Sequence, residues 1–266
     1  MNWVGKNTLL SALLAISLLS ASHVLAQSAE QQGLAIAKER KIRDTGWGDS
    51  TAEMDMILRN AQGQGSVRKM RTRSLEVETD GDKGLTIFDQ PRDISGTAFL
   101  NFSHALKPDD QWMYLPALKR VKRISSRNKS GPFMGSEFAF EDMSSFELEK
   151  YHFTYLRDET YQGQDMFVLE QIPVDKYSGY SKQIVWLDKA QYRAYKVAFY
   201  DRKGSLLKVL ELDNYTQYLD RYWRSLRMVM HNQQNGKSTE LIIHNIQFKT
   251  GLDDRDFDKN TLKRVR

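Results

Sequence analysis

The sequence predicts a mainly β fold with a small helical part (α+β). We expect one large curved antiparallel sheet, or open β-barrel, with N-terminal helices as a lid. Three observations carry this prediction. Helix-forming residues are concentrated before about residue 60, hydrophobic residues alternate with a period of two over most of the remainder, and short turn sequences separate the alternating stretches. Strands that follow one another through short turns form an antiparallel meander, and a long meander curls or closes.

The first 26 residues have the pattern of a secretory signal peptide. Lys6 precedes an apolar run from about Leu9 to Leu19, and small residues lead to Ala26. The apolar run is shorter than the roughly 20 residues that a membrane span needs. We therefore expect cleavage after Ala26, export to the periplasm of a Gram-negative cell, and a single domain over residues 27–266. The chain has no cysteine, which excludes disulfides and a lipid anchor on an N-terminal cysteine.

The helical part covers residues 28–60. The stretch SAEQQGLAIAKERKIRDTGW is rich in helix formers and poor in β-branched residues, which predicts a first helix. A break at Gly46 to Gly48 is followed by Asp49, Ser50 and Thr51, residue types that cap helix N-termini. We therefore expect a second short helix over AEMDMILRNA.

The part after about residue 65 alternates with a period of two. The three aromatic residues of YHFTY, at positions 151, 153 and 155, share one face of an expected strand. Further stretches with one apolar parity are ISGTAFLNF, at Ile94, Ala98, Leu100 and Phe102, and RYWRSLRMVM, at Tyr222, Leu226, Met228 and Met230. Such alternation is typical of a strand with one buried side.

Turn sequences join the expected strands. Asn235-Gly236 between two alternating stretches is a strong hairpin signal. Similar breaks are the residues at 79–82, 188–191 and 201–204. The pattern predicts roughly ten strands. The C-terminal stretch GLDDRDFDKNTLKRVR ends the chain in an expected short docking segment around Phe257 and Leu262.

Most catalytic and nucleotide-binding chemistry has no counterpart in the sequence. No G-x-S-x-G, H-E-x-x-H or G-x-G-x-x-G motif occurs, and the isolated histidines at 104, 152, 231 and 244 offer no convergent metal ligands. The formal net charge of +5 is mild, and export disfavours nucleic acid as a partner. We expect no enzyme activity, no metal, no cofactor and no nucleic-acid binding.

Two charged stretches stand next to each other. In GPFMGSEFAFEDM, residues 131–143, the carboxylates Glu137, Glu141 and Asp142 are placed among aromatics. Glu137 and Glu141 could flank a scissile bond in a hydrolase, although charges dispersed among aromatics in a loop or short helix explain them more simply. Upstream, six cations fall within eleven residues on both parities, which favours an exposed loop or edge or a docking site for anionic headgroups or an acidic partner. They are Lys119, Arg120, Lys122, Arg123, Arg127 and Lys129.

The same region resembles a known family. WMYLPALKRVKRI followed by GPFMGSEFAFEDM is similar to the outer-membrane lipoprotein-sorting proteins of the LolA-like group, with the specific matches at residues 112–116, 119–124 and 133–138. In pattern, the resemblance extends from about residue 45 to the end of the chain. It implies an open LolA/LolB-like β-barrel with a helical lid and an apolar cavity that accepts acyl chains. It does not imply an enzyme.

We therefore expect a soluble, monomeric periplasmic carrier that binds acyl chains of lipids or lipoproteins for transport to or through the outer membrane. Its expected partners are an inner-membrane lipid exporter and an outer-membrane acceptor. An envelope-stress sensor on the same fold, signalling to an inner-membrane protein, and a hydrolase using Glu137 and Glu141 are the alternatives. Gly131 and Gly135 would let residues 131–143 bend as a mobile apolar flap. The expected acyl cavity or its rim comprises Trp112, Tyr114, Phe133, Met134, Phe138 and Phe140.

Overall fold

The computed structural model describes residues 27–264, so the predicted signal peptide lies outside the described residues. One α-helix, α1 (Ala29–Arg43), opens this part of the chain. Ser28 caps it through a reciprocal pair of hydrogen bonds, because the Ser28 hydroxyl accepts from the Gln31 backbone and the Gln31 side chain accepts from the Ser28 backbone. None of the helices in residues 27–264 is long and apolar enough to cross a membrane.

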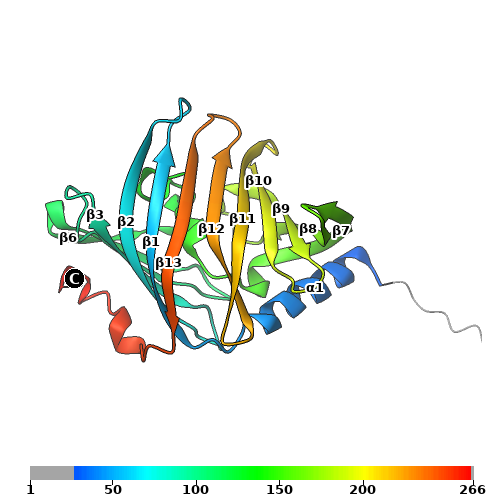
Figure 1. Ribbon diagram of the computed structural model, residues 1–266, viewed down its shortest axis with the longest axis horizontal. Helices are drawn as coiled ribbons and strands as arrows, with labels where there is room; N and C mark the ends of the chain where they lie inside the picture. Colours follow the sequence, from blue (N-terminus) through cyan, green and yellow to red (C-terminus); the bar gives the residue numbers. More distant parts are fainter. Residues whose placement is uncertain (1–26, 265–266) are drawn as a thin grey trace, which may run out of the picture.

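Thirteen strands form one antiparallel sheet in the order β6-β5-β4-β3-β2-β1-β13-β12-β11-β10-β9-β8-β7. Two meanders, β1 to β6 and β7 to β13, meet where β1 pairs with β13. The outermost strands, β6 and β7, each have one neighbour, so the sheet curves without closing (Figure 1). The strands are β1 (Asp49–Arg59), β2 (Gly65–Leu75), β3 (Lys83–Gln90), β4 (Ala98–Phe102), β5 (Asp110–Leu115), β6 (Arg120–Ile124), β7 (Tyr151–Tyr161), β8 (Gln164–Pro173), β9 (Tyr180–Asp188), β10 (Ala194–Asp201), β11 (Leu206–Tyr218), β12 (Tyr222–Asn232) and β13 (Ser238–Phe248).

The predicted curved antiparallel meander is confirmed, with thirteen strands in place of roughly ten. The turns predicted at residues 79–82, 188–191, 201–204 and 235–236 each separate two successive strands. The antiparallel pairing follows from these short connections, since a parallel pair would need a crossover of a dozen or more residues.

The expected second N-terminal helix is wrong, because residues 49–59 form β1. Met54, Met56 and Leu58 lie on one parity of this strand and pack into the main core cluster. The strand is hydrogen-bonded to β2 on one side and to β13 on the other. The helix propensity of these residues is therefore overridden by their position in the middle of the sheet.

Alternation of side chains gives the sheet two faces, and both carry apolar clusters. We call the face that carries Met70, Phe88 and Met230 the inner face. The outer face carries a second cluster that includes Leu85 and Leu100. Both faces of β3 and β4 are therefore buried, which accounts for their nearly continuous apolar sequences.

The inner face is covered by the connection between the two edge strands. This crossing segment, residues 125–150, runs from β6 to β7 and lies behind the sheet in Figure 1. It contains four short 3-10 helices, η2 (Ser126–Asn128), η3 (Phe133–Gly135), η4 (Phe140–Met143) and η5 (Leu148–Lys150). Its residues Phe133 and Phe138 belong to the same buried cluster as Met70 and Met230. The connection thus supplies part of the core.

Helix α1 packs against the opposite end of the inner face, next to β7. Ile36 joins a buried cluster with Leu169 and Val185 of β8 and β9. Gly33 lies so close to β7 that a Cβ atom there would stand 2.7 Å from the backbone nitrogen of Tyr155. Close contact with the strand therefore requires glycine at this position. In place of the two expected lid helices, one helix and the crossing segment cover the inner face.

The C-terminal segment covers part of the outer face. It contains η6 (Asp254–Phe257) and η7 (Leu262–Arg264). Phe257 and Leu262 are buried in the outer cluster against Leu85 and Leu100, which confirms the predicted docking of this segment.

Candidate functional site

A cavity of about 900 Å³ opens on the inner face. This volume lies in the upper part of the range of roughly 300–1,000 Å³ that is typical of small-molecule sites. Its apolar lining includes eleven residues from seven strands and the crossing segment: Met54, Met70, Phe138, Met143, Val185, Val197, Phe199, Leu210, Met228, Met230 and Leu241. Methionine is prominent among them, and its flexible, polarizable side chain adapts to apolar ligands of different shape.

The crossing segment fills the inner face beside this cavity. Phe133 is fully buried, and its ring centroid lies 5.0 Å from that of Phe99 and 5.7 Å from that of Phe140. The Met134 carbonyl accepts a hydrogen bond from the Arg68 side chain, and Phe138 lines the cavity. The structure thus brings these four predicted residues together. Phe138 forms cavity wall, whereas the other three belong to the packed core beside it.

Buried polar contacts hold the crossing segment to the sheet. The Lys208 ammonium of β11 lies 2.7 Å from the Asp142 carboxylate, and both side chains are more than nine-tenths buried. It also donates to the Glu137 carbonyl at 2.8 Å. Asp142 further accepts hydrogen bonds from the Tyr180 hydroxyl and from the Ala139 backbone, both at 2.7 Å. The expected mobile flap is corrected accordingly, because residues 131–143 form an anchored plug.

The two carboxylates considered for hydrolysis have structural partners. Glu137 accepts from the Asn232 amide at 2.7 Å, at the hairpin end of the sheet. Glu141 accepts from the Ser178 hydroxyl at 2.7 Å and from the Gly179 backbone at 2.8 Å. Burial raises the pKa of Glu141, although these hydrogen bonds oppose the shift. Both side chains therefore fasten the crossing segment to neighbouring strands and loops.

Trp112 and Tyr114 lie apart from the other expected cavity residues. They belong to the outer cluster, on the opposite face from their neighbour Met113. The Trp112 ring packs edge-on against Phe102, with centroids 5.2 Å apart, and the Lys259 ammonium lies over it at 5.6 Å. Neither residue lines the cavity, so the expected set is corrected by removing both. The sequence does not say which alternate residues of a strand face the cavity, and a shift of one residue moves a side chain to the other face of the sheet.

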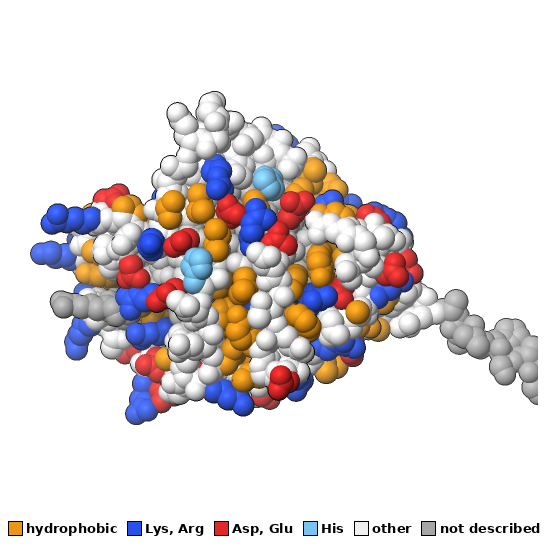
Figure 2. All heavy atoms as spheres, in the orientation of Figure 1, with side chains coloured by type: hydrophobic (Ala, Val, Ile, Leu, Met, Phe, Trp, Pro, Cys, Tyr) orange, Lys and Arg blue, Asp and Glu red, His pale blue; other side chains and the backbone are white. Residues whose placement is uncertain are grey.

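The predicted basic stretch lies at the free edge of the sheet. Its members Lys119, Arg120, Lys122 and Arg127 are exposed and, within residues 27–264, form no ion pair. Arg123 is paired with Asp110. In Figure 2, Lys and Arg side chains gather at the left end of the molecule, where Figure 1 places β6 and the C-terminal segment. We call these five side chains, together with the exposed Lys263 and Arg264 of the adjoining η7, the basic edge.

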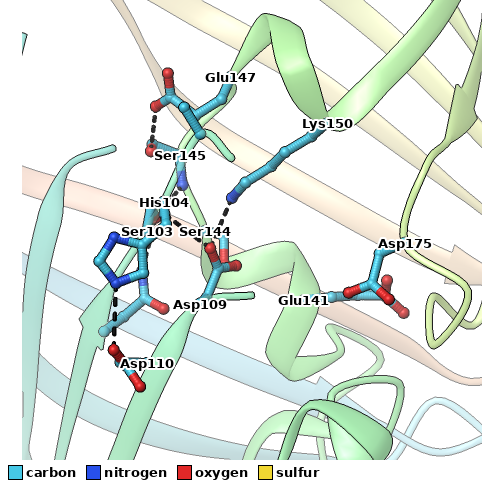
Figure 3. A network of polar contacts seen from close by, with 12 residues as sticks. Ser103, His104, Asp109, Asp110, Glu141, Ser144, Ser145, Glu147, Lys150 and Asp175 are labelled. Carbon is cyan, nitrogen blue, oxygen red and sulfur yellow. Dashed lines mark hydrogen bonds and ion pairs between the residues drawn. The ribbon is translucent and has the colours of Figure 1, made fainter. Parts of the chain in front are cut away.

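A polar network fastens the loop after β4 to the crossing segment (Figure 3). Asp109 accepts hydrogen bonds from the Lys150 ammonium at 2.9 Å and from the Ser144 hydroxyl at 2.6 Å. The Ser103 hydroxyl accepts from the Ser145 backbone at 2.8 Å. Nearby, His104 lies between the carboxylates of Asp80, at 2.6 Å, and Asp110, at 3.3 Å. These contacts join parts of the chain that the sequence separates by about forty residues.

The network continues to helix α1. Glu147 is almost fully buried, accepts from the Ser145 hydroxyl at 2.6 Å and forms an ion pair with Lys41 of α1 at 2.8 Å. Asp82 lies near this pair and lines the cavity. Burial raises the pKa of Asp82 to about 6. The helix, the crossing segment and the loop after β4 are thereby held together around the cavity.

The sequence reasoning missed the polar residues of the cavity. Arg40, Tyr151, Gln171 and Gln183 line it from α1, β7, β8 and β9. Gln171 and Gln183 are cross-strand partners, and burial raises the pKa of Tyr151 to about 12. The alternation of YHFTY could have placed Tyr151 on the buried face, but nothing local distinguishes the two glutamines or Arg40 from surface residues.

A model of a protein family whose members are described as uncharacterized proteins matches residues 80–264. No curated protein matches the chain. Among solved structures, an outer membrane lipoprotein-sorting protein domain from Vibrio parahaemolyticus is 69% identical, with a TM-score of 0.87, and the match covers 88% of this chain and 100% of that one.

Two further solved structures share the fold. A DUF1329 family protein from Desulfovibrio piger is 28% identical, with a TM-score of 0.84, and the match covers 88% of this chain and 99% of that one. A LolA superfamily protein from Nitrosomonas europaea is 21% identical, with a TM-score of 0.69, over 86% of this chain and 98% of that one. The last similarity, at this level of identity, concerns the fold alone.

Proposed function

This chain belongs to the family of the outer membrane lipoprotein-sorting protein domain from Vibrio parahaemolyticus, and on that premise we propose that it is a periplasmic carrier of lipid or lipoprotein acyl chains. The LolA-like fold supports a carrier role in general. Export through the signal peptide at residues 1–26, and transfer from an inner-membrane lipid exporter to an outer-membrane acceptor, are parts of the same proposal.

The observation that carries the proposal is the cavity on the inner face. Its lining is rich in methionine and other apolar side chains, and its volume of about 900 Å³ suits a ligand of lipid size. Burial of a methylene group contributes about 0.8 kcal/mol, so fourteen methylenes would contribute on the order of 11 kcal/mol before the cost of ordering the chain. Such a contribution is large enough to compete with a membrane for the acyl chain.

Two substitutions on β11 test the cavity with a matched control. Leu210 lines the cavity, whereas its neighbour Val209 packs against the outer-face cluster around Trp186. We expect Leu210→Gln to weaken binding of a fluorescent long-chain acyl probe at least tenfold, which corresponds to about 1.4 kcal/mol. Val209→Gln should leave binding within twofold of the wild type, because the two residues differ in face and not in strand.

Mass spectrometry of the natively purified chain supplies the second measurement. A carrier should retain lipid through purification and release it on denaturation. A chain that contains no lipid and binds no acyl probe would refute the proposal. Specific capture of an inner-membrane protein by such a lipid-free chain would favour the envelope-sensor alternative instead.

We assign the basic edge to contact with anionic headgroups at a membrane surface. A Lys or Arg near an anionic surface contributes about 1 kcal/mol, and this attraction is screened by salt. Replacing Lys119, Arg120 and Lys122 by Gln should therefore reduce sedimentation with vesicles that contain phosphatidylglycerol, and the difference should shrink as salt is added. Equal sedimentation of both proteins at low salt would refute this assignment.

A further inference from the structure

The cavity has a polar end that is formed by side chains of α1, β7, β8 and β9. The Arg40 guanidinium lies 4.3 Å from the centroid of the Phe146 ring, and that ring stacks on Tyr151. Gln183 lines the same cavity and faces Gln171 across the β8–β9 pair. The polar end, defined as Arg40, Tyr151, Gln171 and Gln183, thus shares one cavity with the methionine-rich wall.

Arg40 is a cation without an anionic partner. Within residues 27–264 its side chain forms no ion pair and no hydrogen bond, in contrast to Lys41, which pairs with Glu147, and Arg43, which pairs with Glu39. Asp44, four residues further along the chain, is the acid whose charge acts on Arg40, and it is engaged with Arg224 at 2.6 Å. Desolvation lowers the pKa of Arg40, yet a guanidinium remains charged at any physiological pH. Arg40 is half-buried, and a partly desolvated charge is costly unless an anion compensates it.

A second polar group at this end lacks a partner. Gln171 is 2% exposed, and its amide nitrogen has no hydrogen-bond acceptor among the described residues. Buried donors are nearly always satisfied, so an orphan donor on a cavity wall indicates a missing acceptor. The guanidinium of Arg40 and the amide of Gln171 both donate. The group that would complete both is an oxygen acceptor with negative charge.

None of the six carboxylates that line the cavity forms an ion pair with Arg40 within residues 27–264, and three of the six are closely held by lysines. Asp142 is paired with Lys208, Asp109 with Lys150, and Asp175 with Lys129, at 2.7, 2.9 and 2.7 Å respectively. Arg40 is therefore a half-buried cation of the cavity lining that forms no ion pair with a described residue.

We propose that the cavity binds an acyl chain that ends in an anionic oxygen group, a carboxylate or a phosphate, with that group at Arg40 and Gln171 and the chain along the methionine-rich wall. This inference rests on the proposed carrier function and names the ligand class of the same site. A neutral ester or alcohol head would satisfy the amide of Gln171 but leave the charge of Arg40 without a counter-ion.

Three probes of equal chain length test the proposal on the mature chain: palmitate, hexadecyl phosphate and hexadecanol, each measured by displacement of a fluorescent acyl probe. We expect the wild type to bind the better of the two anions about 10- to 100-fold more tightly than hexadecanol, the factor that corresponds to a charge-assisted hydrogen bond. Preference for palmitate would identify a fatty acid, and preference for hexadecyl phosphate a phosphate head.

Variants of α1 locate the anion. Arg40→Met should remove the preference for anions and leave the affinity for hexadecanol within twofold, whereas Arg43→Met, which removes a cation from the same helix away from the cavity, should retain the preference. Equal binding of all three probes by the wild type would overturn the inference while leaving carriage intact, and this arm does not depend on whether a variant folds. An equal loss for all probes in folded Arg40→Met protein would also overturn it. Failure of every probe to bind the wild type would refute the proposed function itself.

Discussion

The buried ion pair between Lys208 and Asp142 offers the sharpest test of the crossing segment as an anchored plug. The two side chains are 4% and 7% exposed and lie 2.7 Å apart. Lys208→Met would leave the Asp142 carboxylate buried without a cation, and breaking a buried pair in this way costs about 3–5 kcal/mol. Because Asp142 keeps its hydrogen bonds from Tyr180 and from the Ala139 backbone, we expect a loss near the lower limit.

Urea unfolding followed by tryptophan fluorescence measures this loss. A decrease of about 3 kcal/mol should lower the unfolding midpoint by roughly 1 M, given an m-value near 3 kcal/mol/M for a chain of this size. The double variant Lys208→Met, Asp142→Asn removes both charges and should recover at least half of the loss, since the two residues are directly coupled.

An exposed ion pair provides the control. Lys182 and Glu170 lie 2.8 Å apart with side chains 39% and 20% exposed, so Lys182→Met should cost at most about 1 kcal/mol. Equal effects of Lys208→Met and Lys182→Met, or no recovery in the double variant, would refute the anchoring of residues 131–143 through this pair.

Three further predictions concern the covers of the sheet and the cavity. Burial raises the native pKa of Asp82 from the ordinary 3.8 to about 6, so the wild type loses stability as the pH rises through 6. At 1.36 kcal/mol per pKa unit, Asp82→Asn should raise the free energy of unfolding at pH 8 by about 3 kcal/mol. Denaturation at a series of pH values should show the two proteins converging below about pH 4. Gly33→Ala should destabilise the chain by roughly 1–3 kcal/mol by pushing α1 away from β7, and calorimetry should show little effect for Gly84→Ala, where a Cβ meets open space. Phe257→Ala should cost about 3–5 kcal/mol in urea unfolding by opening a hole under the outer cluster, with acyl-probe affinity unchanged because the cavity lies on the other face.

Local pattern identified most strands but failed where two signals competed. Asp49, Ser50 and Thr51 look like a helix cap, and Met54 and Met56 suit a helix as well as a strand. Only pairing with β2 and β13 decided in favour of β1. Alternation indicates that a strand has a buried side, but it does not say which face of the sheet that side joins.

The same limit explains the outcome for the candidate site. Phe133 and Phe138 were found from their density in one short stretch, and the structure places both in the inner core. Trp112 and Tyr114 have equally apolar sequence surroundings, yet they pack under the C-terminal segment on the outer face. Arg40 carries no local signal at all, because its lack of a partner results from contacts that its neighbours make elsewhere.

The sequence by itself determined the antiparallel meander, its turns, the cationic stretch and the resemblance that points to acyl-chain carriage, because periodicity, turn chemistry and charge density are properties of short segments. The tertiary structure alone decided that the connection between the edge strands crosses the inner face, which apolar residues line the cavity, and that Arg40 and Gln171 both line it without an ion-pair or hydrogen-bond partner among the described residues. These features depend on contacts between residues far apart in the chain, and burial and pairing exist only once those residues are brought together.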